Sequence, residues 1–87
     1  MNDLTRYKLV AGLPVPAAAK LIYFYLLDRS YERSTAISVK QLGKNIGISY
    51  SATRKNLQRL KRMDMIDIAP RFSDDGGRLS NCYKTKL

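Results

Sequence analysis

The stretch LGKNIGISYSATRKNLQRL, residues 42–60, has the pattern of two helices joined by a tight turn. Gly47 divides it, because a glycine readily takes the left-handed backbone conformation that ends a helix. Ser49 follows, and a serine hydroxyl caps the first turn of a helix. The stretch therefore predicts a short helix over residues 39–46, a tight turn, and a second helix over residues 50–63.

Apolar residues at helical spacing give the two predicted helices a shared core. Gly43 is the small residue at which the helices cross closely, and Thr53 and Met63 are expected to face inward. The apolar core positions are Leu42, Ile46, Ile48, Leu57 and Leu60. Two helices joined in this way form a helix-turn-helix, a motif that presents its second helix to the major groove of DNA.

The flanking sequence predicts a helix before this motif and a β-hairpin after it. Residues 16–31 begin with Pro16 and carry a broad apolar stripe, which favours a largely buried first helix. Residues 1–13 mix polar and apolar side chains and are expected to form an extended arm or a short strand. Residues 65–85 alternate with period two about an Asp-Asp-Gly-Gly turn, and Pro70 makes their first strand an edge strand or an irregular one.

A short extended segment is expected at residues 36–38, between the first two helices, and Ser38 is the expected cap of the helix over residues 39–46. Helix, short strand, helix, helix and hairpin is the order of a winged helix-turn-helix. The expected fold class is therefore α+β, mainly α, with three helices and a C-terminal hairpin, the wing, in a single domain over residues 1–87.

Residues 14–85 resemble the bacterial winged helix-turn-helix domains of transcription regulators and of the N-terminal domains of plasmid and phage replication initiators. AAKLIYFYLLDRS is similar to the first helix of the initiator branch, LGKNIGISYSATRKNLQRLKRMDMI to the helix-turn-helix, and GGRLSNCYKTKL to the return strand of the wing. Two residues depart from the family pattern, Thr53 at a usually aliphatic position and Asp64 at a usual glycine. The resemblance implies that residues 49–63 read the major groove while the wing contacts the DNA backbone or the minor groove.

The net charge of +9 is concentrated in the middle of the chain. Residues 41–63 hold six basic residues and no acidic one, whereas residues 64–87 hold four of each. A concentrated positive segment needs an anionic partner or bare solvent. On a predicted helix-turn-helix we take this partner to be double-stranded DNA. The second hypothesis is a protein-interaction module whose winged-helix surface docks an acidic protein.

Candidate contact residues follow from helix geometry. Five side chains on the face opposite Leu57 and Leu60 include groups that pair with guanine or adenine edges; these base-contact candidates are Tyr50, Ser51, Arg54, Lys55 and Gln58. Seven further residues are candidates for contacts to the phosphate backbone: Lys44, Ser49, Arg59, Lys61, Arg62, Arg71 and Arg78.

Composition argues against several other function classes. The sequence has no histidine, which removes imidazole bases, histidine zinc ligands and a pH switch near neutrality. Its one cysteine, Cys82, forms neither an internal disulfide nor a cysteine-rich metal site. We therefore expect a non-enzymatic protein without a metal, cofactor or small-molecule ligand. A nuclease or recombinase fragment is disfavoured because no cluster of carboxylates stands out.

The expected role is transcriptional regulation or replication initiation of a mobile element, and the chain is a candidate homodimer. The N-terminus lacks the pattern of a signal peptide, and the longest apolar run, residues 21–27, is far shorter than the roughly 18–20 residues that cross a bilayer. A cytoplasmic location in a bacterium, encoded by the host or by a phage or plasmid, is therefore expected, without a membrane partner.

Overall fold

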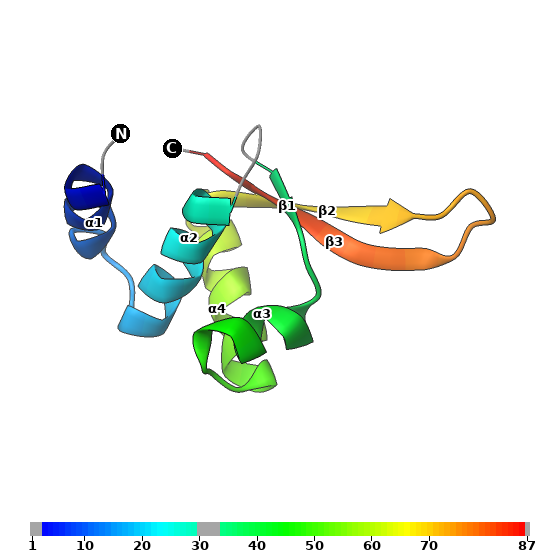
Figure 1. The fold of residues 1–87 in the computed structure, drawn as a ribbon, viewed down its shortest axis with the longest axis horizontal. Coiled ribbons are helices and arrows are strands. Elements are labelled where there is room, and N and C mark those ends of the chain that lie inside the picture. The colour runs from blue at the N-terminus through cyan, green and yellow to red at the C-terminus, as the bar shows by residue number, and fades with distance from the viewer. Residues whose placement is uncertain (1–2, 30–33, 87) are drawn as a thin grey trace.

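The computed structural model describes residues 3–29 and 34–86 and arranges them as helices packed against one antiparallel sheet (Figure 1). The helices of these residues are α1 (Asp3–Ala11), α2 (Ala17–Arg29), α3 (Val39–Ile46) and α4 (Tyr50–Arg62). The strands are β1 (Ser34–Ala36), β2 (Ile66–Phe72) and β3 (Arg78–Thr85). The predicted α+β class, mainly α with a C-terminal hairpin, is confirmed.

Serine caps and a left-handed glycine set the boundaries of α3 and α4, as predicted. The Ser49 hydroxyl accepts a hydrogen bond from the Ala52 N–H at 3.1 Å, and Ser38 caps α3 in the same way. Gly47 has φ 78°, and its N–H donates to the Gly43 carbonyl at 2.8 Å. These local interactions satisfy backbone groups that helix ends leave without partners.

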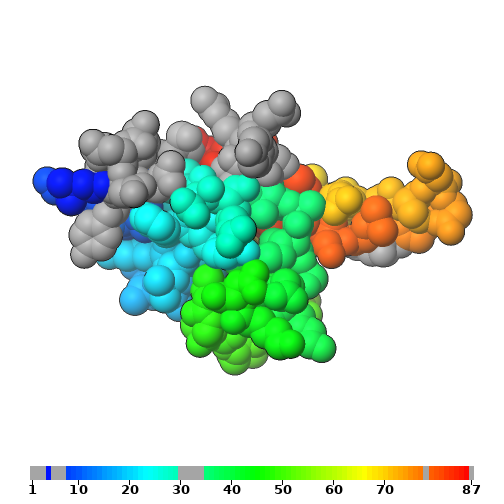
Figure 2. Space-filling model, in the orientation of Figure 1, coloured from blue at the N-terminus to red at the C-terminus, as the bar shows by residue number. Residues whose placement is uncertain are grey.

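The sheet has the strand order β1-β3-β2, so the last strand in the chain is the central one. The pairing of β2 with β3 shifts register between Ala69 and Arg71, at Pro70, which has no N–H to donate. The prediction of an edge strand or an irregular one is confirmed, since β2 is both. Beyond the irregularity β2 and β3 continue as a wing that projects from the helices (Figures 1 and 2), and the molecule is 43 Å long.

The apolar core lies between α2, α4 and the sheet. Each large aliphatic side chain buried there, such as Ile22 or Leu26, contributes about 1.5–3 kcal/mol relative to an exposed position. Helix α2 is its centre, because it packs against α1, α3, α4, β1 and β3. The buried apolar residues are Val10, Ala19, Ile22, Tyr23, Leu26, Leu42, Leu57, Leu60, Ile66 and Tyr83.

The extended arm predicted for residues 1–13 is wrong, and so is the total of three helices, because α1 occupies this segment. Two contacts with α2 account for the helix. Val10 is buried against the core, and the Lys20 ammonium donates to the Ala11 carbonyl at 2.6 Å, which satisfies an acceptor at the C-terminal end of α1. Gly12 follows the last helical residue, which is where glycine commonly ends a helix.

Two other element boundaries differ from those predicted. Pro16 precedes α2 and its carbonyl accepts from the Lys20 N–H, while residues 30 and 31 of the predicted first helix lie outside the described residues. The short strand comes two residues earlier than residues 36–38, because Ser38 is already the cap of α3.

Met63 was expected to face inward but is 41% exposed. The chain leaves the helical path after Arg62, and Asp64 takes φ 60°, a left-handed conformation that aspartate tolerates better than most residues. The N–H of Met65 then donates to the Leu60 carbonyl at 3.0 Å, and Met65 packs against the core. The sharp turn therefore carries Met63 outward.

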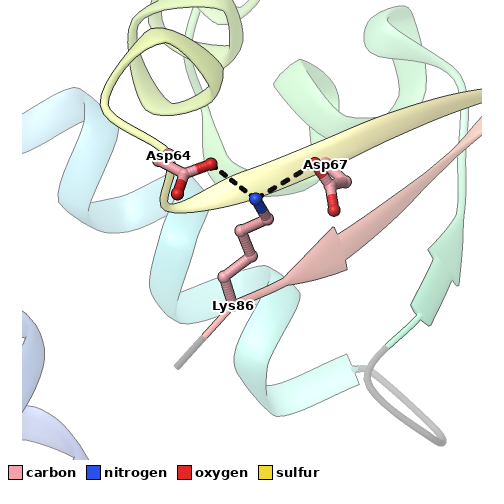
Figure 3. Close-up of polar contacts among 3 residues, drawn as sticks. All are labelled: Asp64, Asp67 and Lys86. Carbon is pink, nitrogen blue, oxygen red and sulfur yellow. Dashed lines mark hydrogen bonds and ion pairs between the residues drawn. The ribbon is translucent and has the colours of Figure 1, made fainter.

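An ion-pair cluster fastens the end of β3 to this turn. The Lys86 ammonium lies 2.5 Å from Asp64 and 3.5 Å from Asp67 (Figure 3). The hydrogen bond to Asp64 is the main reason that the pKa of Lys86 is raised, and the nearby charges of Asp64 and Asp67 add to it. The cluster joins the α4–β2 turn to the central strand.

Candidate nucleic-acid interface

The position of α4 is fixed by a close crossing with α3. A Cβ atom placed on Gly43 would lie 2.7 Å from Thr53 Oγ1 and 2.8 Å from the Ile48 carbonyl oxygen, which is closer than real contacts allow. Thr53 is fully buried, and its hydroxyl donates to the Ser49 carbonyl at 2.7 Å. The threonine therefore fits the predicted core position with its hydroxyl satisfied inside the helix.

A series of side-chain hydrogen bonds joins α3 to α2. Gln41 Nε2 donates to Asn45 Oδ1 at 2.7 Å, and Asn45 Nδ2 donates to the Tyr25 hydroxyl at 2.8 Å. The Arg29 guanidinium lies 5.5 Å from the centre of the Tyr25 ring. These positioning residues were not predicted; the spacing of Gln41 and Asn45 by four residues was the signal available in the sequence.

The outer face of α4 gathers all five base-contact candidates. They line a shallow hollow of about 420 Å³ together with Arg62, and its lining residues are Tyr50, Ser51, Arg54, Lys55, Gln58 and Arg62. Thr53, Leu57 and Leu60 face the core on the opposite side of the helix. The spacing of 50, 54, 58 and 62 by four residues explains why Arg62 shares this face.

The backbone-contact candidates do not form one group. Lys44 and Lys61 are exposed on α3 and α4, whereas Arg59 is half-buried and its Nε atom is enclosed without a hydrogen-bond partner. The Ser49 hydroxyl already accepts a hydrogen bond as the cap of α4. Arg62 lies with the base-contact candidates, as described above.

The wing carries cations along its length and acids at its tip. Arg71 is exposed on β2 and lies opposite Leu79. For Arg78 the structure describes the backbone, which pairs with Phe72. At the tip, Asp75 accepts hydrogen bonds from the Ser73 hydroxyl and, at 3.1 Å, from the Gly77 N–H. These bonds, the Ser73 bond first, lower the pKa of Asp75 and outweigh its desolvation.

Helices α3 and α4 carry positive charge only. Helices α3 and α4 contain seven basic residues and no acidic residue, and their basic residues are Lys40, Lys44, Arg54, Lys55, Arg59, Lys61 and Arg62. Exposed cations around a hollow that is lined by polar and charged residues suit a polyanion with polar edges. Within residues 3–29 and 34–86 no group of three carboxylate, thiol or imidazole side chains is placed to hold a metal ion. None of the described helices is long and apolar enough to cross a membrane.

No family model and no curated protein matches the chain. One solved structure, described as a "possible transcriptional regulator" from Methanosarcina mazei Go1, superposes with a TM-score of 0.65. The match covers 100% of this chain and 68% of that one, at 17% sequence identity. The likeness shows a shared fold, and the described helices and three-stranded sheet are those of a winged-helix-like protein.

Proposed function

We propose that this protein binds double-stranded DNA in a sequence-specific manner, with α4 as the recognition helix and without enzymatic activity of its own. The observation that carries the proposal is the outer face of α4, where Tyr50, Arg54 and Gln58 share one hollow on a helix that has no acid. An α-helix with side chains is about 10–12 Å across, and the major groove of B-DNA is about 12 Å wide.

The residue types suit two kinds of DNA contact, to base edges and to phosphates. Arg54 and Lys55 have the donors that pair with guanine O6 and N7, and Gln58 has the donor and acceptor that pair with adenine. Tyr50 and Ser51 lie in the first turn of α4 and complete the base-contact set. Lys44, Lys61 and the wing residues Arg71 and Arg78 are suited to phosphate oxygens, which would set position rather than sequence.

The two backbone candidates on the last turns of α4 need separate roles. Arg62 shares the hollow, so we assign it to the border between base edges and backbone. Arg59 keeps part of its guanidinium enclosed, so it contributes charge and packing more than a direct phosphate contact.

Transcriptional regulation in the cytoplasm is the role we propose. The winged-helix-like fold shared with a protein described as a possible transcriptional regulator supports it. Replication initiation of a plasmid or phage in a bacterium is the second proposal, supported by the resemblance of residues 18–30 to the first helix of initiators.

Selection of bound duplexes from a random pool tests the proposal. Enrichment of a defined motif is expected, and an Arg54→Ala variant should lose part of the enrichment while Lys8→Ala, a control at an exposed lysine on α1, retains it. Direct repeats in the motif would favour the initiator role. A pool that remains random after selection would contradict sequence-specific DNA binding. Binding to an acidic protein in its place would favour the protein-interaction module.

A further inference from the structure

The end of the molecule formed by α1 and α2 has a second, apolar hollow of about 580 Å³. Its lining residues are Val10, Ala11, Ala17, Lys20, Leu21 and Phe24. Leu21 forms part of its wall yet is 52% exposed, and Leu4 of α1 is 62% exposed. Single exposed leucines are common on monomeric proteins, but contiguous exposed apolar surface commonly marks an interaction site.

Helix periodicity joins these residues into one surface. Leu4 and Ala11 are seven residues apart on α1, and Ala17, Leu21 and Phe24 are spaced by four and three residues on α2. Each set therefore lies along one side of its helix. The surface thus has a hollow with the half-exposed Leu21 in its wall, and Leu4 lies two turns further along α1. An interface between two identical copies requires both a hollow and a protruding side chain on each copy.

Charge favours this end for contact between copies of a chain with a net charge of +9. Helices α1 and α2 contain four basic residues, Arg6, Lys8, Lys20 and Arg29, against two acidic ones, Asp3 and Asp28, and the Lys20 ammonium donates to the Ala11 carbonyl. Helices α3 and α4 hold seven basic residues. Like-charge repulsion is therefore weakest where the α1–α2 ends approach each other.

We propose that two copies of this chain associate through this surface, with Leu21 of each copy seated in the hollow of the other. None of the lining residues belongs to α3, α4 or the wing, and α1 and the wing lie at opposite ends of the molecule (Figures 1 and 2). The dimer therefore leaves both α4 faces open. This inference goes beyond DNA binding and does not depend on it.

Sedimentation equilibrium of the purified chain without DNA tests the dimer. Leu21→Glu and Leu4→Glu should each raise the dimer dissociation constant at least about tenfold, because two-fold symmetry places every substituted carboxylate in the interface twice. The control is Leu79→Glu, at an exposed leucine on the wing, and it should leave the dissociation constant unchanged. Circular dichroism melts establish that each variant is folded. Because Leu4 and Leu21 lie on different helices, a local distortion of one helix would not explain the same effect in both variants.

Salt separates this proposal from DNA binding. Screening of the repulsion between two cationic copies should lower the dimer dissociation constant as salt rises, whereas the affinity for DNA should fall. A wild-type chain that stays monomeric through micromolar concentrations at high salt would overturn the dimer and leave the DNA proposal intact. A dimer that survives both glutamate variants would overturn this surface as its interface.

Discussion

Gly43 of α3 and Thr53 of α4 meet so closely that a Cβ atom on the glycine would lie 2.7 Å from the threonine hydroxyl oxygen. Neither neighbour can withdraw easily, since Thr53 is fully buried and the second close atom, the Ile48 carbonyl oxygen, belongs to the backbone. The orientation of the candidate recognition helix thus depends on the absence of one methyl group.

Gly43→Ala should lower the free energy of unfolding by about 1–3 kcal/mol, the usual cost of overpacking a core. Thermal or urea denaturation followed by circular dichroism measures it. Gly12→Ala is the control, because a Cβ there would meet its nearest neighbour, the Lys8 carbonyl oxygen, at an ordinary 3.5 Å. Equal stability of the two variants would contradict the close crossing.

Gly47→Val should be destabilising for a different reason. A Cβ at Gly47 would meet nothing within 4 Å, but φ is 78°, and a β-branched residue in the left-handed region costs on the order of 1–2 kcal/mol. Gly47→Asn should lose less, because asparagine tolerates this conformation better. The same denaturation experiment compares the two, and an equal loss for both would mean that the strain does not come from backbone conformation.

The affinity for duplex DNA should fall steeply with salt. If about four to six phosphates are contacted, each adds about −0.9 to the slope of log affinity against log salt concentration, which gives a slope of roughly −4 to −5. Fluorescence anisotropy of a labelled duplex from low to physiological salt measures the slope. Lys61→Ala should reduce the magnitude of the slope by about 0.9, the contribution of one phosphate contact. A slope near zero for the wild type would contradict the proposed interface.

Substitutions on α4 should separate base reading from charge. Arg54→Ala should relax the preference at one base pair by about 1–3 kcal/mol, whereas Lys61→Ala, outside the hollow, should weaken all sequences alike. Binding of both variants to a selected site and to its single-base variants, at constant salt, provides the comparison. The reverse pattern would place the other side of α4 in the groove.

Stability should decline at alkaline pH through Lys86. Its pKa is raised in the folded protein, so its contribution is complete below the ordinary lysine value of about 10.4 and is lost as pH rises through the higher folded value. Lys86→Met should lower stability at neutral pH and flatten the decline in this range. Lys40→Met, at an exposed lysine on α3, should leave the decline of stability at alkaline pH unchanged. Identical alkaline profiles for the two variants would contradict the role of the Lys86 cluster.

The sequence was informative wherever the signal was local. Interactions within a few residues set a helix boundary: a serine hydroxyl accepts from a nearby N–H group, or a glycine takes a left-handed conformation. Ser38, Gly47 and Ser49 behave as predicted. Period-3.6 reasoning likewise brought the five base-contact candidates to one face of α4. Whether these side chains contact DNA stays a prediction, as does the assignment of the whole chain to one domain.

The rest depends on contacts between distant residues. Helix α1 is stabilised by Val10 in the core and by the bond from Lys20 to Ala11, and neither can be read from residues 1–13 alone. The exposure of Met63 follows from a left-handed Asp64, whose effect on the direction of the chain is tertiary. Partial enclosure of Arg59 likewise results from packing that periodicity does not specify.

The central place of β3 in the sheet has a consequence for the protein during its synthesis. Strand β1, which precedes both helices of the helix-turn-helix, pairs with β3 and with no other described strand. On the ribosome, α3 and α4 therefore emerge well before the strand that completes the sheet, and long-range pairing of this kind is slow compared with helix formation. A nascent chain that stops before residue 78 would carry the whole cationic sequence of α4 without the strand that completes the sheet beside it.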